Sequence, residues 1–119
     1  MIIKNQKNSA KITGNEGAII HDLLNPAHVG NIIKYSLAHV NLSCGKSTVS
    51  HIMKTSEVYY ILQGSGIMHI DDNSKNVKVG DAIFVKPGSK QYIENTGKEN
   101  LEFLCIVEPA WKKDDEIIL

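Results

Sequence analysis

The sequence has few cysteines and no excess of charge of either sign. Its 119 residues include two cysteines, Cys44 and Cys105, whose spacing matches no zinc or redox motif. Thirteen basic and thirteen acidic residues give a formal net charge of zero. No overall field would therefore draw the protein to nucleic acid or to an anionic membrane. We predict unpaired, half-buried thiols and no nucleic-acid partner.

Long apolar stretches are also missing. No run approaches the roughly 20 residues that a membrane helix needs, and the opening MIIKNQKNSAK shows no apolar signal core or small-residue cleavage site. We therefore expect no membrane partner and a cytoplasmic location, where a disulfide is disfavoured. Phosphate loops, serine nucleophile motifs and basic aromatic strips do not appear, so we set those functional classes aside.

Short segments rich in β-branched and aromatic residues fill the second half of the chain. Turn residues separate them at regular intervals, and no convincing helix lies between them, which is typical of an antiparallel sandwich or barrel. The fold class is therefore predicted to be all-β. The segments are TVSHIMK, EVYYILQ, GIMHID, NVKV, DAIFVK, QYIEN and LEFLCIV.

The domain organisation follows from the flanking segments. Residues 1–17 are mostly polar and predict a loosely held arm, whereas residues 18–108 carry the strands of one β-barrel domain. Within the barrel, residues 18–24 and 31–42 are predicted to be its first strands. Residues 109–119 form a tail that combines a tryptophan, a charge run and an apolar end. The tail could dock on the barrel or on a second subunit, and we expect it to pack on the barrel.

Polar side chains that could carry chemistry occur on two of the predicted strands. Alternate residues of a strand share a face, so His51 and Met53 point the same way, as do Glu57 and Tyr59 on the next strand. If that face is the interior of a small barrel, a histidine and a carboxylate meet there. A further strand contributes Gln91 to the same site.

The stretch from residue 45 to residue 64 resembles the first motif of the cupin superfamily. That motif reads Gly, five residues, His, one residue, His, three or four residues, Glu, six residues, Gly. Here Gly45, His51, Glu57 and Gly64 occupy the corresponding positions, and Met53 replaces the second histidine.

A second stretch resembles the second cupin motif, which reads Gly, five residues, Pro, one residue, Gly, two residues, His, three residues, Asn. Gly80, Gly88 and Asn95 match, the proline is shifted by one position to Pro87, and Gln91 replaces the histidine. The resemblance implies an antiparallel double-stranded β-helix, or jelly-roll barrel, and a homodimer. Both motifs together span residues 45 to 95.

In the superfamily, three histidines and the glutamate usually hold one divalent metal ion inside the barrel. Carried over, these positions offer His51, Met53, Glu57 and Gln91, which mix a soft thioether with hard oxygen donors. We expect Met53 to pack, which leaves His51, Glu57 and Gln91 as candidate ligands of a weak divalent-metal site. A metal-free cluster, in which the same three residues hydrogen bond to one another, is the open alternative.

Two functional classes follow for this site. The first is an enzyme that acts on a small sugar or carboxylate, with His51 or Glu57 as base or ligand. The second is a non-catalytic module that binds or senses a small molecule. In both, the pocket walls are predicted to be Met53, Tyr59 and Ile93, because small ligands bind at barrel mouths among apolar walls and a few polar groups.

Overall fold

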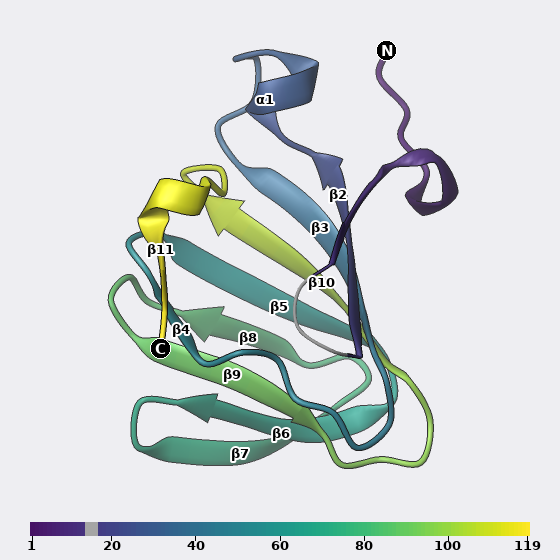
Figure 1. Cartoon of the computed structure of the whole chain (residues 1–119), viewed down its shortest axis with the longest axis vertical. Coiled ribbons are helices and arrows are strands. Elements are labelled where there is room, and N and C mark those ends of the chain that lie inside the picture. The colour runs from purple at the N-terminus through teal and green to yellow at the C-terminus, as the bar shows by residue number, and fades with distance from the viewer. Residues whose placement is uncertain (14–16) are drawn as a thin grey trace.

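The computed structural model describes residues 1–13 and 17–119, and it is a sandwich of two antiparallel sheets (Figure 1). Positions 14–16 of the predicted arm lie outside the described residues. The larger sheet has six strands, in the order β1 (Ala10–Thr13), β2 (Ala18–Leu24), β3 (Ser36–Leu42), β10 (Leu101–Glu108), β5 (Ser56–Gln63) and β8 (Ala82–Val85). The all-β prediction is confirmed.

The smaller sheet has five strands and faces the larger one. Its order is β11 (Glu116–Ile118), β4 (His51–Met53), β9 (Lys90–Asn95), β6 (Ser65–Ile70) and β7 (Asn73–Lys78). Three short helical segments lie outside the sheets: η1 (Gln6–Asn8), α1 (Pro26–Val29) and η2 (Lys113–Asp115). No helix among the described residues is long and apolar enough to cross a bilayer.

The core fills the space between the sheets because alternate residues of each strand point inward. Along β10, for example, Leu101, Phe103 and Cys105 are buried while the residues between them are more exposed. Tyr59 on β5 packs against Phe103, with ring centroids 5.3 Å apart. From the opposite sheet, Ile93 is fully buried in the same core cluster.

Glycine is required where β5 turns into β6. Gly64 has φ of 84°, and a Cβ atom there would lie 2.7 Å from the carbonyl oxygen of Asn100. At Gly66, a Cβ would lie 2.1 Å from the carbonyl oxygen of Glu94. Side chains at these positions would clash with backbone, so the two glycines allow close approach to the backbone of Asn100 and of Glu94.

The structure changes the predicted boundaries in three places. Residues 10–13 of the predicted arm form β1, which pairs antiparallel with β2. Residues 31–35 of the strand predicted over 31–42 lie before β3, which begins at Ser36. The C-terminal tail ends in β11, which pairs with β4 at the edge of the smaller sheet.

Hydrogen bonds hold the tail against the barrel. The Trp111 backbone N–H donates to Ser36 Oγ at 2.9 Å, and Asn25 Nδ2 donates to the Trp111 carbonyl oxygen at 3.2 Å. The expected packing of the tail on the barrel is therefore observed. Its last residues, Ile117, Ile118 and Leu119, keep about half of their surface exposed.

Candidate functional site

Five strands contribute side chains to a polar cluster between the two sheets. From the larger sheet, β5 contributes Glu57 and Tyr59, both buried. In the smaller sheet, His51 on β4 pairs directly with Gln91 on β9. We call these four residues the inner cluster; β10 and β11 contribute the neighbours described below.

Glu57 is the electrostatic centre of the inner cluster. Only 7% of its surface is exposed, and its Oε1 atom has no hydrogen-bond partner among the residues that the structure describes. Burial raises the pKa of Glu57 to about 7, although the nearby His51 acts in the opposite direction. This carboxyl group therefore exchanges between its acid and carboxylate forms near neutral pH.

The imidazole of His51 has a fixed orientation. Its Nδ1 atom lies 2.8 Å from the carbonyl oxygen of Val49. Because a carbonyl oxygen only accepts, Nδ1 carries the proton, and in the neutral ring Nε2 carries the lone pair. Nε2 is thus the atom of His51 that can bind a proton, a ligand or a metal ion.

Gln91 and Tyr59 form a bonded pair inside the cluster. The Tyr59 hydroxyl donates a hydrogen bond to Oε1 of Gln91, and both side chains are almost completely buried. Burial also raises the pKa of Tyr59 well above its usual value, so the phenol remains a donor. The carbonyl oxygen of Gln91 already accepts this bond, which leaves its amide group as the available donor.

Two neighbours of Glu57 were not predicted as site residues. Cys105 on β10 pairs in register with Tyr59, and its buried thiol, like the Gln91 amide, lowers the pKa of Glu57 by hydrogen bonding to the carboxyl group. Glu116 on β11 raises that pKa. The alternation of LEFLCIV places Cys105 inward and could have identified it. Nothing in the charge run of the tail indicates that Glu116 approaches the barrel interior.

The remaining predicted residues occupy structural positions. Met53 is 2% exposed and Ile93 is fully buried, so both belong to the packed interior. Asn95, from the second motif, donates through Nδ2 to the carbonyl oxygens of Leu42 at 3.0 Å and of Glu99 at 2.9 Å. Asn95 therefore anchors the loop between β9 and β10. The cysteines are both free, but Cys44 is exposed and Cys105 buried, which differs from the half-buried state expected of them.

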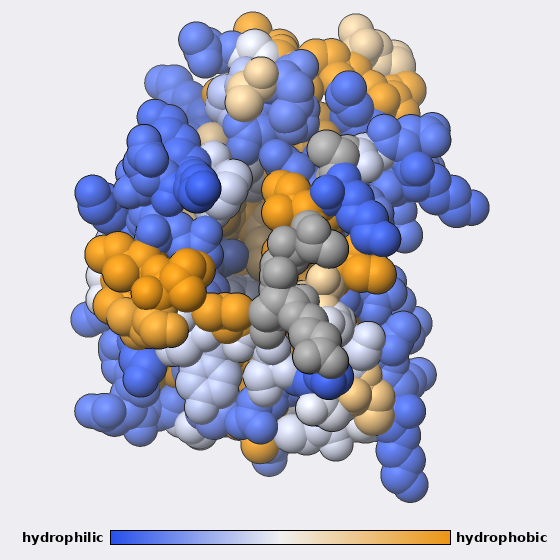
Figure 2. All heavy atoms as spheres, viewed as in Figure 1, coloured by the Kyte–Doolittle hydropathy of each residue, from blue (hydrophilic) through white to orange (hydrophobic). Residues whose placement is uncertain are grey.

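The molecular surface is hollowed on the side that carries the C-terminus (Figure 2). The hollow adjoins the apolar patch over β11, and Figure 1 shows β5 and β10 behind it. These two strands carry Glu57, Tyr59 and Cys105 on their inward faces. The hollow therefore lies in front of the strands that carry these side chains.

Comparison with known proteins gives a consistent assignment. The family model for the cupin domain matches residues 38–107. An uncharacterized protein of Methanocaldococcus jannaschii is 39% identical over 105 residues, covering 87% of this chain and 83% of that protein. This chain is a cupin.

Two further relatives carry names that refer to oxalate. An oxalate-binding protein of Thermotoga maritima is 49% identical to this cupin over 53 residues, which are 43% of this chain and 42% of that protein. The crystal structure of a predicted oxalate decarboxylase from Thermotoga maritima superimposes with a TM-score of 0.78 at 28% identity. It covers 91% of this chain and 99% of that one.

The donor set does not fit the four-ligand metal centre that the cupin family implies. No group of three or more His, Cys, Asp or Glu side chains within residues 1–13 and 17–119 could hold a metal ion. Met53 offers only a thioether, and the amide oxygen of Gln91 is a weak donor that already accepts a hydrogen bond from Tyr59. Glu57 Oε1 and His51 Nε2 remain as donors, which is fewer than a structural or catalytic ion normally takes from protein.

Proposed function

We propose that this cupin binds a small organic carboxylate in the inner cluster. The observation that carries the proposal is Glu57 Oε1, a buried polar atom without a hydrogen-bond partner among the described residues. Such an atom costs free energy unless a ligand or water satisfies it. The name of the oxalate-binding relative supports a carboxylate as the ligand class.

The protonation of Glu57 explains how a buried acid could accept an anion. In its acid form, Glu57 donates an O–H to the ligand carboxylate, and a bond of this type to an ionised acceptor is strong. In its ionised form, it repels the same ligand. With the pKa of Glu57 at about 7, we expect carboxylate affinity to fall about tenfold for each pH unit above that value. A neutral sugar would not show this dependence.

Calorimetric titration tests the proposal directly. Oxalate and other small carboxylates, with neutral sugars in parallel, are titrated into the wild type at pH 6, 7 and 8. Glu57→Gln keeps a neutral hydrogen-bond donor, so we expect its carboxylate affinity to become independent of pH. The exposed Glu99→Gln serves as the matched control and should behave like the wild type. Saturable carboxylate binding with the same pH dependence in Glu57→Gln would contradict the assigned role.

A divalent ion in the inner cluster is the second candidate. The lone pair of His51 Nε2 favours it, because metal-ligating histidines commonly donate their other ring N–H to a carbonyl, as Nδ1 does here. In this version His51 and Glu57 are the main ligands, and Gln91 contributes the second lone pair of the oxygen that accepts from Tyr59, so the site is weak. Elemental analysis of purified protein, with His51→Ala and Glu57→Ala, distinguishes the candidates. Stoichiometric metal that disappears in both variants would favour the ion.

Catalysis in the inner cluster requires a separate test. The pKa of Glu57, about 7, suits a general acid or base at neutral pH. Incubation with each carboxylate that binds, followed by product analysis, separates an enzyme from a binding module. Turnover that is lost in Glu57→Gln would identify an enzyme, and saturable binding without product would identify a binding or sensing module.

We also propose a homodimer in the cytoplasm. The outward face of the larger sheet exposes the apolar side chains of Tyr60, Leu62, Phe84 and Ile106, and such patches often mark contacts between subunits. Both cysteines are free, as expected in a reducing compartment. Light scattering of the purified protein measures its oligomeric state. A mass of 13.2 kDa, that of the monomer, would exclude a stable dimer.

A further inference from the structure

A second cluster of reactive side chains lies on the opposite face of the smaller sheet. We call Ser74, His69, Glu94 and Tyr92 the outer cluster. His69 on β6 pairs in register with Ser74 on β7 and with Tyr92 on β9. The Ser74 Oγ atom lies 2.8 Å from His69 Nδ1, and His69 Nε2 contacts Glu94 Oε1. Serine, histidine and carboxylate thus form one hydrogen-bonded chain.

The bonding pattern assigns a role to each member of the chain. Glu94 as a carboxylate only accepts, so Nε2 of His69 carries the proton and Nδ1 accepts the hydrogen bond from the Ser74 hydroxyl. The His69 ring stacks on Tyr92 with centroids 4.1 Å apart and an interplanar angle of 8°, which fixes the plane of the imidazole. This is the order nucleophile, base and orienting carboxylate, which defines a triad by geometry and not by sequence.

The free edge of β7 supplies hydrogen-bond donors beside the nucleophile. β7 is the last strand of its sheet, and its Lys78 N–H donates to Asp81 Oδ2 at 2.9 Å instead of to β6. Because N–H groups alternate in direction along a strand, those of Asn76 and Ser74 point to the same edge. The N–H of Ser74 can therefore donate to the oxyanion that forms on the ester carbonyl oxygen when the Ser74 hydroxyl attacks.

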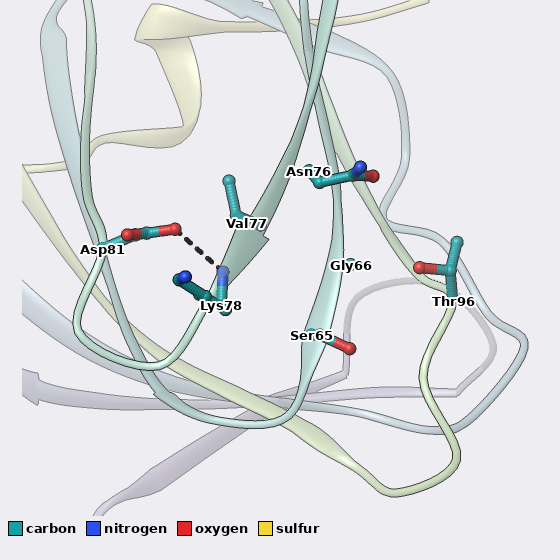
Figure 3. A pocket seen from close by; sticks show the side chains of 7 residues that line it. All are labelled: Ser65, Gly66, Asn76, Val77, Lys78, Asp81 and Thr96. Carbon is teal, nitrogen blue, oxygen red and sulfur yellow. Dashed lines mark hydrogen bonds between the residues drawn. The ribbon is translucent and has the colours of Figure 1, made fainter.

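A surface cavity of about 310 Å³ lies on the same strands (Figure 3). Asn76 and Lys78 line it from β7, two and four residues beyond Ser74, and Ser65 and Thr96 line it from neighbouring segments. In Figure 3, Ser65, Asn76 and Thr96 lie on the same side of these strands. Hydroxyl, amide and ammonium groups line this cavity together with the carboxylate of Asp81, and this mixture suits a polar substrate portion.

We propose that the outer cluster is an ester-cleaving site with Ser74 as its nucleophile. The Ser74 Oγ attacks the ester carbonyl carbon while its proton passes to His69 Nδ1. The bond from that carbon to the leaving oxygen then breaks, and the leaving alcohol takes the proton from His69. Water, activated by the same nitrogen, hydrolyses the acyl-serine to release the acid. Glu94 is a positioning residue that holds the reactive tautomer.

Two measurements on the full-length protein test this proposal. After treatment with a fluorophosphonate, mass spectrometry should locate one adduct on the peptide that contains Ser74. With p-nitrophenyl acetate, Ser74→Ala should reduce hydrolysis to the buffer rate, and His69→Gln should reduce it about 100-fold. Glu94→Gln should lower kcat with little change in KM, which a purely structural role would not produce.

The exposed Ser43→Ala is the control and should retain the wild-type adduct and rate. Ser74 is also exposed, so its replacement by alanine should leave the thermal unfolding curve unchanged. An adduct elsewhere than Ser74, no adduct, or equal hydrolysis by the wild type and Ser74→Ala would overturn the proposal. These results do not depend on carboxylate binding in the inner cluster.

Discussion

The inner and outer clusters use the same residue types in opposite environments. In each, a glutamate and a tyrosine of one strand meet a histidine of another strand, but Glu57 is 7% exposed whereas the side chain of Glu94 is 36% exposed. Inside, burial raises the pKa of the carboxyl group to about 7. Outside, Glu94 accepts a hydrogen bond from His69 beside solvent. The comparison shows that the chemistry available to a residue type depends on whether its side chain lies on the buried or the exposed face of the strand.

The largest expected difference between the inner and outer faces is in the stability lost when an apolar side chain is shortened. Ile93 lines the inner cluster and is fully buried, whereas Ile106 is 40% exposed on the outward face of β10. Ile93→Ala should lower the free energy of unfolding by about 2–5 kcal/mol through lost contacts and a cavity. Ile106→Ala should lower it by less than about 1 kcal/mol. Urea denaturation measures both, and equal losses would place the inner cluster outside the packed core.

The second prediction concerns pH. The folded protein holds the Glu57 proton up to a pKa of about 7, against 4.5 for an unperturbed glutamate. Between these values the folded state binds more protons than the unfolded state, so stability decreases as pH rises. This difference in pKa corresponds to about 3 kcal/mol of the free energy of unfolding, which is lost between about pH 4.5 and somewhat above pH 7.

Glu57→Gln removes this contribution. The difference in unfolding free energy between Glu57→Gln and the wild type should therefore shift in favour of the variant as pH rises through that window. Urea denaturation at pH 4.5, 6 and 8 measures the shift. A constant difference across the three pH values would mean that Glu57 titrates alike in the folded and unfolded states.

The smallest expected difference separates two tyrosines. Tyr59→Phe removes the donor to Gln91, and the buried amide oxygen then loses its partner, at a cost of about 1–3 kcal/mol. Tyr92→Phe keeps the ring that stacks on His69, so its effect should stay within about 0.5 kcal/mol. Thermal unfolding of the two variants measures the contrast, and a neutral Tyr59→Phe would remove Gln91 from the bonded pair.

The sequence predicted the sheet strands well where apolar residues alternate with polar ones. LEFLCIV and QYIEN correspond closely to β10 and β9, because burial of one face imposes that alternation. β1 and β11 were not predicted, since both lie in polar or charged segments that form strands only by pairing with an edge. Tertiary pairing overrides local propensity in such segments.

The sequence predicted the residues of the inner cluster but not those of the outer cluster. Motif resemblance placed His51, Glu57 and Gln91 together, and the register pairs His51 directly with Gln91. The outer cluster was not predicted, and serine nucleophiles were set aside because no linear motif is present. Ser74 and Glu94 are 20 residues apart in sequence and meet at His69 only through strand pairing. Which strands become neighbours is a property of the whole fold.

The most direct test of the account is the titration of the Glu57 carboxyl group in the folded protein. Carbon-13 NMR of glutamate-labelled protein, with Glu57→Gln to assign the resonance, gives its midpoint without any assumption about the ligand. We predict a midpoint near 7, the value to which burial raises this pKa. A midpoint near the unperturbed 4.5 would show a solvated carboxylate, and would contradict the buried acid on which the proposed carboxylate site depends.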